Sequence, residues 1–99
     1  MVKVVWTEKA LTDLEDIGDY ISKDSIKYAK LTLEKLISTA AIIAINPYIG
    51  RIVPEKNDKS IREIIKGNYR VIYQISSETA VFILTVFHSA RLLTENEIK

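Results

Sequence analysis

The chain has 99 residues, of which 47% are hydrophobic, and its formal net charge is +1. This length suits a single domain whose one modest core buries only about 60–70% of the unfolded surface. Because the chain has no cysteine and only one histidine, disulfides and thiolate metal sites are excluded, and we expect neither a metal nor another cofactor. The low net charge excludes a strong overall attraction to nucleic acid.

Membrane and export signals are weak. The opening segment MVKVVW is too short for a signal peptide. The longest stretch without charge, residues 36–50, has 15 residues and contains the Asn46–Pro47 pair, so it is too short and too broken to span a bilayer. We therefore expect a cytoplasmic protein with no membrane contact.

The first half of the chain predicts one short strand and two helices. Residues 2–6 have strand character, and Thr7 is a suitable N-cap for a helix whose first turn contains Glu8. Apolar side chains then recur at helical spacing, at Ala10, Leu14, Ile17 and Ile21. The segment SKDS breaks this helix, and a second helical pattern runs from residue 26 to residue 44, where Asn46–Pro47 stops it. Together they predict a helical hairpin.

In the second half, the period of the apolar pattern changes to two. It predicts a short strand at residues 51–53 and two strands, 60–66 and 69–75, joined by a tight turn at Gly67–Asn68. Residues 80–87 are apolar on both faces, which is typical of a central strand. The order is β-α-α-β-β-β, which predicts one α+β domain over residues 1–99, with the helical hairpin packed on one face of a small, mainly antiparallel sheet.

The end of the second predicted helix, AAIIAI, is apolar all the way round. Such a helix needs cover on every side, and a small domain does not supply much. We therefore expect Ile42, Ile43 and Ile45 to contact a partner chain.

His88 directly follows the apolar strand and is the only histidine. A histidine there can be a general acid or base near neutral pH, or it can hydrogen-bond the backbone where the strand ends. No nucleophile motif accompanies it, because Ser89 lacks the Gly-x-Ser-x-Gly turn. From the residues alone, both interpretations stay open.

The middle of the chain is locally basic, since residues 51–75 hold six Lys or Arg and three Asp or Glu. Arg62 and Arg70 fall on neighbouring strands across the predicted turn. Two guanidinium groups on one sheet face would bind a phosphate or a carboxylate. The alternative is an ion pair with Glu63 or Glu55 and otherwise solvated side chains.

Four segments in order resemble the RelE/ParE superfamily of toxins from type II toxin–antitoxin modules, and together they span nearly the whole chain. They are WTEKALTDLEDIGDYI, NPYIGRIVPE, REIIKGNYRVIYQI and VFILTVFHSARLL. The resemblance implies the fold deduced above, a role in growth inhibition and plasmid stabilisation, and a cognate antitoxin, usually encoded beside the toxin gene, that would cover the apolar helix end.

The resemblance leaves two mechanisms. RelE-like members cleave mRNA on the ribosome by attack of the 2′-hydroxyl on the adjacent phosphate, which needs a base, an acid and cations. Compared with the YoeB-like subgroup, Glu55, Arg70 and His88 fall at the positions of these groups, with Arg62 and Arg51 as further charge stabilisers. The tyrosine that follows the histidine in that subgroup is replaced here by Ser89.

ParE-like members instead poison DNA gyrase by binding it, and many share the strand end that carries His88 and Arg91. We favour this branch, because a net charge of +1 is low for docking on ribosomal RNA and because the aromatic residue after His88 is missing. Arg51 and Arg91 are then expected to contact the target or the antitoxin. The alternatives are an mRNA endonuclease that acts on the ribosome, and an inactive member that only binds its antitoxin.

Overall fold

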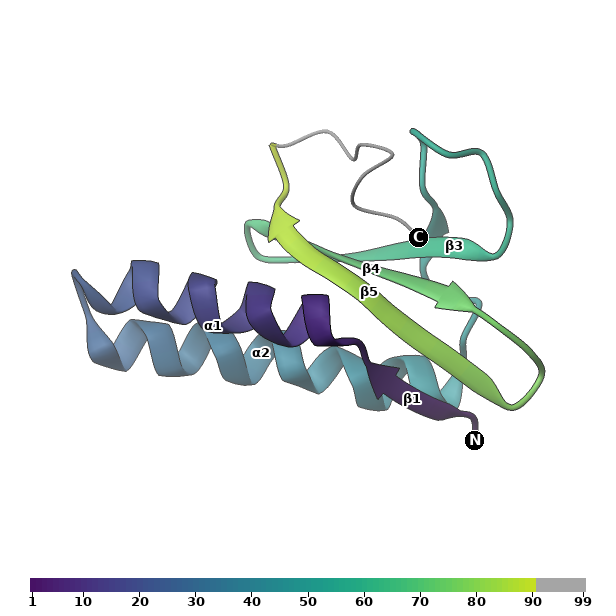
Figure 1. Cartoon of the computed structure of the whole chain (residues 1–99), viewed down its shortest axis with the longest axis horizontal. Coiled ribbons are helices and arrows are strands. Elements are labelled where there is room, and N and C mark those ends of the chain that lie inside the picture. Colours follow the sequence, from purple (N-terminus) through teal and green to yellow (C-terminus); the bar gives the residue numbers. More distant parts are fainter. Residues whose placement is uncertain (91–99) are drawn as a thin grey trace.

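A computed structural model describes residues 1–90 of the chain (Figure 1). The order of elements follows the predicted β-α-α-β-β-β, with the short strand at residue 51 as an additional, fifth strand. The elements are β1 (Lys3–Trp6), α1 (Glu8–Ser22), α2 (Ile26–Ile45), β2 (Arg51–Ile52), β3 (Ile61–Lys66), β4 (Tyr69–Ile75) and β5 (Ala80–His88). The predicted α+β fold is confirmed. The observed strand ends differ from the predicted ones by one residue at most, and β5 extends to His88 itself.

The helices begin and end where the sequence provides caps. Thr7 is the N-cap of α1, and its hydroxyl accepts a hydrogen bond from the Ala10 amide. Ser25 caps α2 in the same way. Helix α2 ends at Ile45, and its C-cap Asn46 directly precedes a proline that cannot continue the helix. Within residues 1–90, neither helix is long and apolar enough to cross a membrane.

The five strands form one sheet in the order β1-β5-β4-β3-β2, and both helices lie along one side of it (Figure 1). Neighbouring strands are antiparallel except β1, which pairs with β5 in parallel. The Gly67–Asn68 turn joins β3 and β4 directly, since Lys66 pairs with Tyr69. Gly67 has a φ of +60°, a conformation that suits glycine.

Each face of the sheet has its own apolar cluster. On the helix-covered face, residues of both helices pack against alternate residues of the two central strands, among them Val71, Tyr73 and Ile83. The opposite face, which we call the open face, holds a smaller cluster of Val53, Ile61, Ile72, Phe87 and partly buried Leu84. Because directly paired strand residues share a face, the register assigns every strand side chain to one of these two environments.

The pairing of β4 with β5 is interrupted by a β-bulge. Tyr73 pairs with Ile83 and Ile72 pairs with Thr85, so Leu84 is the extra residue. The bulge shifts the register of everything that follows. As a result, His88 lies opposite Tyr69 on the helix-covered face, and Phe87 lies opposite Arg70 on the open face.

The apolar end of α2 is covered mostly from within. Ile43 is fully buried in the core, so it cannot contact a partner in this conformation, and that part of the prediction is corrected. The N-terminal segment supplies part of the cover, since Val2 and Val4 pack on the cluster that contains Ile43 and the Val2 amide donates to the Ala44 carbonyl. Ile42 is half-buried, whereas Ile45 is 74% exposed and stays available for contact.

Candidate functional site

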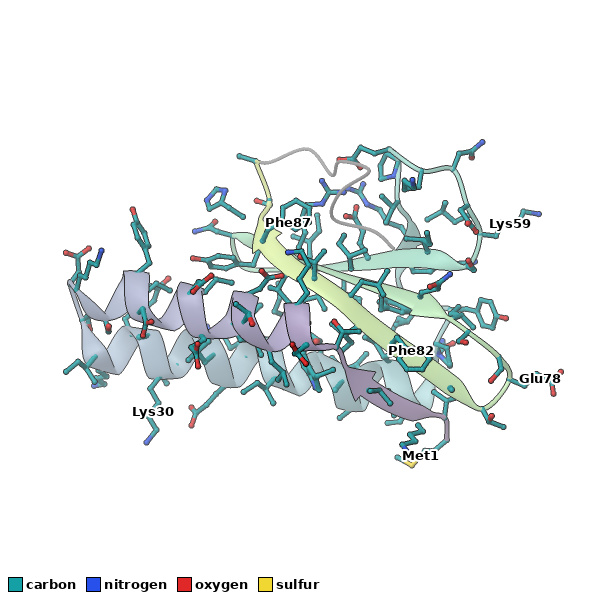
Figure 2. All side chains as sticks on the ribbon, viewed as in Figure 1. Met1, Lys30, Lys59, Glu78, Phe82 and Phe87 are labelled. Carbon is teal, nitrogen blue, oxygen red and sulfur yellow. The ribbon has the colours of Figure 1, made fainter. Side chains whose placement is uncertain are left out.

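The open face carries a buried cluster of charges around Arg70. The Arg70 Nε donates to a carboxylate oxygen of Glu63 at 2.6 Å, and its two terminal nitrogens each donate to Glu55 at 2.8 Å. Glu63 also accepts from Arg51. Figure 2 shows Phe87 near the C-terminal end of β5, where the Arg70 guanidinium lies 5.2 Å from its ring centroid. The two arginines and two glutamates therefore balance one another.

Most of this charge cluster is buried. The side chains of Arg70 and Glu63 are 5% and 0% exposed, while that of Arg51 is 61% exposed. The pKa of Arg70 is raised, chiefly by its hydrogen bonds to Glu55 and then by Glu63, against the opposing effect of burial. The guanidinium is thus held charged, with its charge directed at carboxylates.

A shallow recess of about 330 Å³ opens beside this cluster. Its lining combines residues from β2 and the loop after it, from β3 and β4, and from the position after β5: Arg51, Pro54, Glu55, Ile65, Arg70 and Ser89. Three residues that were predicted from the sequence, Arg51, Glu55 and Arg70, are therefore brought together.

Arg62 is not part of this cluster. It pairs with Tyr73, which packs on the helix-covered face, whereas Arg70 packs on the open face. The prediction of two arginines on one sheet face is therefore wrong. The Arg62 guanidinium donates to the Gly50 carbonyl at 3.1 Å and lies 5.1 Å from the Tyr48 ring centroid, so it holds the loop before β2 in place.

His88 is also separated from Arg70. Its exposed ring meets the Tyr69 ring edge-on, with centroids 5.8 Å apart, and its Nδ1 accepts a hydrogen bond from the Ala90 amide at 3.1 Å. It lines a groove of about 390 Å³ between α1 and the end of β5. Glu55 and Arg70 thus lie on one face of the sheet, and His88 lies on the other.

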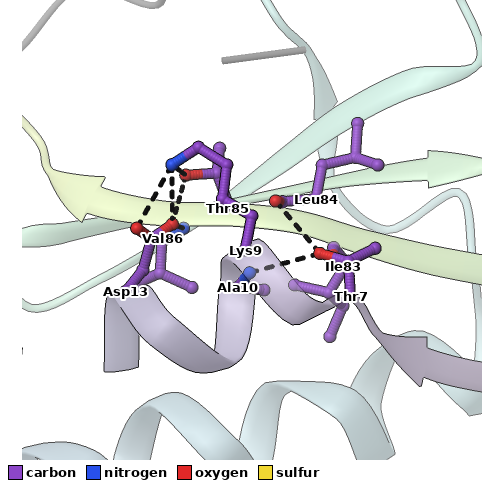
Figure 3. A network of polar contacts seen from close by, with 8 residues as sticks. All are labelled: Thr7, Lys9, Ala10, Asp13, Ile83, Leu84, Thr85 and Val86. Carbon is purple, nitrogen blue, oxygen red and sulfur yellow. Dashed lines mark hydrogen bonds and ion pairs between the residues drawn. The ribbon is translucent and has the colours of Figure 1, made fainter. Parts of the chain in front are cut away.

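A polar clip between α1 and β5 was not predicted from the sequence (Figure 3). One carboxylate oxygen of Asp13 accepts hydrogen bonds from the Thr85 hydroxyl and, at 3.0 Å, from the Val86 amide. Lys9 donates to the same carboxylate, and Thr7 donates to the Ile83 carbonyl at 2.7 Å. Since β1 pairs with β5 only as far as Ile83, these side chains take over as partners for the rest of the strand edge.

Glu63 was predicted only as one possible ion-pair partner, although the sequence does carry a signal. It stands between Ile61 and Ile65 on the apolar side of β3, and a charge at such a position requires a buried partner. The residue Arg91, predicted to contact a target or an antitoxin, lies outside the described residues.

Comparison with known proteins agrees with this architecture. Residues 4–93 match the family model described as the ParE toxin of the type II toxin–antitoxin system parDE. The toxin RelE2 of Caulobacter vibrioides is 34% identical over 92 residues, which are 93% of this chain and all of that protein.

Two solved structures share the fold. One is described as a chromosomal ParDE toxin–antitoxin system from P. aeruginosa, with a TM-score of 0.73, 18% identity, and 89% of this chain and 96% of that chain covered. The other is the toxin–antitoxin complex RelBE2 from Mycobacterium tuberculosis, with a TM-score of 0.63, 24% identity, and coverage of 88% and 96%.

Proposed function

The chain belongs to the RelE/ParE superfamily of type II toxin–antitoxin toxins, and we propose that it stops growth in the ParE manner, by binding DNA gyrase in the cytoplasm until a cognate antitoxin neutralises it. On this proposal the toxin is an inhibitor that acts through its surface, and no bond in a substrate is broken by its side chains.

The observation that carries the proposal is the separation of the groups that a nuclease would need. Arg70 is 4% exposed and directs its guanidinium at Glu63 and Glu55, so it does not present its charge to a phosphate. Glu55, the candidate base, is bound to that same guanidinium. His88, the candidate acid, lies across the sheet from both. The recess that Glu55 and Arg70 line does not include His88, so the three groups do not converge on one position as cleavage of one phosphodiester would require.

One observation favours mRNA cleavage as the second candidate. Arg51, Glu55, Arg70 and Ser89 line a single recess on the open face. If the loop that carries Glu55 moved away, Arg70 would face that recess, although Glu63 would still neutralise it. The RelE2 name of the Caulobacter relative is consistent with this branch.

The experiment is a short induction of the toxin in cells that lack the antitoxin, with translation, mRNA integrity and DNA integrity followed together. Gyrase inhibition predicts intact mRNA, an early rise in DNA breaks, and linear plasmid when purified toxin, gyrase and ATP are mixed. An early fall in translation with cleaved mRNA would replace the proposal with the endonuclease. Normal growth would indicate an inactive member.

His88→Ala separates the two mechanisms further. Because the His88 side chain is exposed and makes one backbone hydrogen bond, the variant is expected to fold and to remain toxic. If His88 were the acid–base group of a nuclease, its removal would instead lower the cleavage rate by a factor of about 10²–10⁴. The matched control is Lys30→Ala, an exposed change on α2.

A further inference from the structure

We propose that the groove between α1 and the end of β5 docks a lysine or arginine side chain of the antitoxin, with Asp16 as its charge partner and Tyr20 and Tyr69 as its aromatic walls. This inference rests on the proposed function insofar as that function includes an antitoxin. It does not depend on which target the toxin inhibits.

The groove has the shape and lining of a side-chain site. It measures about 390 Å³, and Val86, which is 2% exposed, lies at its floor. Ile17 adds apolar surface from α1, and Tyr20, 71% exposed, stands at its rim. An apolar floor suits the methylene stem of a long basic side chain, and tyrosine faces attract its cationic end.

The charge of this face is acidic. Helix α1 holds five acidic residues, Glu8, Asp13, Glu15, Asp16 and Asp19, against the single cation Lys9. Of the two that line the groove, Asp13 is already bound to Lys9, Thr85 and Val86. Asp16 is exposed and makes no ion pair among residues 1–90. The groove therefore offers one available carboxylate, which is the complement of one basic side chain.

Of the remaining polar groups of the groove, Tyr69 can accept a hydrogen bond from a cation, whereas His88 offers only a donor. Because Nδ1 of His88 accepts from the Ala90 amide, the neutral ring carries its proton on Nε2. The pKa of Tyr69 is raised by burial and by the neighbouring hydroxyls of Tyr28 and Tyr20, so this phenol stays neutral. Its oxygen can accept a hydrogen bond from a guanidinium or ammonium group.

The same charge argues against RNA at this face. A phosphate that approached His88 would meet Asp16 and the acidic surface of α1, and like charges repel. Six of the fourteen basic residues lie elsewhere, in residues 51–75, where they outnumber three acidic residues. The groove therefore fits a basic segment of a protein.

The test measures the affinity of the full-length toxin for the antitoxin encoded beside its gene, by titration at low and high salt. Asp16→Asn is expected to weaken binding about 5- to 30-fold, since the carboxylate that pairs with the basic side chain loses its charge. Asp19→Asn, on the same helix but outside the groove lining, is the matched control and should leave the affinity within about twofold. Each lysine and arginine of the antitoxin is then changed to glutamine, and one of them should lose its effect in the Asp16→Asn background.

The outcomes separate this inference from the proposed function. Equal affinities for Asp16→Asn and Asp19→Asn, or effects of Asp16→Asn that add to those of every antitoxin variant, would overturn the groove assignment and leave the toxin's function untouched. No binding of the wild-type toxin would overturn the antitoxin partner itself. If the toxin did not inhibit gyrase but Asp16 showed the expected coupling to one antitoxin residue, the proposed target would be wrong and the groove assignment would stand.

A second measurement avoids the antitoxin. Nuclear magnetic resonance titration of the toxin with N-acetyl-arginine amide should move the signals of Asp16, Tyr69 and His88 with a dissociation constant in the millimolar range, and the neutral N-acetyl-citrulline amide should not. Shifts that are the same for both probes, or that are unchanged in Asp16→Asn, would contradict the assignment.

Discussion

Arg70 and Glu63 form a hydrogen-bonded ion pair, 2.6 Å between Nε and the carboxylate oxygen, in which neither side chain is more than 5% exposed. The pair spans two neighbouring strands on the open face of the sheet, and Glu55 and Arg51 close it from either side. A buried pair of this kind stabilises little compared with an apolar pair of the same volume, but removal of one partner leaves the other as an uncompensated charge.

Arg70→Met is therefore expected to lower the free energy of unfolding by about 3–5 kcal/mol, because it leaves Glu63 without its buried partner and with only the exposed Arg51. The double variant with Glu63→Leu should recover most of that loss. Urea denaturation of both variants measures the effect. The pair would not be a structural unit if Arg70→Met were as stable as the wild type. The same would follow if the double variant were as unstable as Arg70→Met. The expected result also means that lost toxicity in an Arg70 variant is no evidence for catalysis.

A separate prediction concerns the hydrogen bonds by which Asp13 holds the end of β5. Asp13→Ala removes the acceptor of the Val86 amide and of the Thr85 hydroxyl, both at buried positions. The expected loss is about 1–3 kcal/mol, with faster hydrogen exchange at the Val86 amide. Glu15→Ala, an exposed change on the same helix, serves as the control and should stay within about 0.5 kcal/mol. Unchanged protection of Val86 would contradict the role of the clip.

Much of the fold could be predicted because its signals are local. The caps at Thr7 and Ser25, the stop at Asn46–Pro47 and the turn at Gly67–Asn68 all depend on residues close in the chain. The direct turn at Gly67–Asn68 places residue 62 opposite residue 73. What the register implied for Arg62 was missed, because paired residues share a face and Tyr73 belongs to the helix-covered core.

The arrangement of the site depends on two features without a local signal. The bulge at Leu84 lies in a strand that is apolar on both faces, so no alternation marks the extra residue, and yet it decides which face His88 occupies. The ion pair of Arg70 with Glu55 depends on the loop between β2 and β3, where Asn57 adopts a φ of 50°. The sequence offered Glu55 and Glu63 as alternative ion-pair partners, but it marked neither the bulge nor the loop conformation that lets Arg70 bind both.

Gly50 is predicted to tolerate no side chain. A Cβ there would lie 2.5 Å from the Tyr73 hydroxyl oxygen and 2.6 Å from the Glu63 carbonyl oxygen, and the second of these is backbone that cannot turn away. Gly50→Ala should cost about 1–3 kcal/mol in thermal or urea unfolding. The control is Gly67→Asn, since no heavy atom lies within 4 Å of a Cβ at Gly67 and asparagine adopts a positive φ readily. Equal stability of the two variants would contradict the predicted clash.

Tyr73 makes the stability depend on alkaline pH. Its hydroxyl donates to the Pro47 carbonyl at 2.6 Å and accepts from the Gly50 amide at 2.9 Å, so it ties the loop before β2 to the core. The pKa of Tyr73 is raised above its ordinary value of 10.0, mainly because burial desolvates the phenolate, although the Gly50 amide and the charge of Arg62 act in the opposite direction.

The sign of the pH effect follows from this direction. The folded state holds the phenolic proton more tightly than the unfolded state, so the stabilisation is complete below pH 10 and is lost as the pH rises towards the raised pKa. Tyr73→Phe should cost about 1 kcal/mol at neutral pH, because it removes the two hydrogen bonds. It should also lose less stability than the wild type between pH 10 and 12. The difference between the two proteins cancels the contribution of Tyr69, whose pKa is raised as well. If the free energies of unfolding of the two proteins fell in parallel above pH 10, Tyr73 would ionise equally in the folded and unfolded states, and its hydroxyl would not anchor the loop.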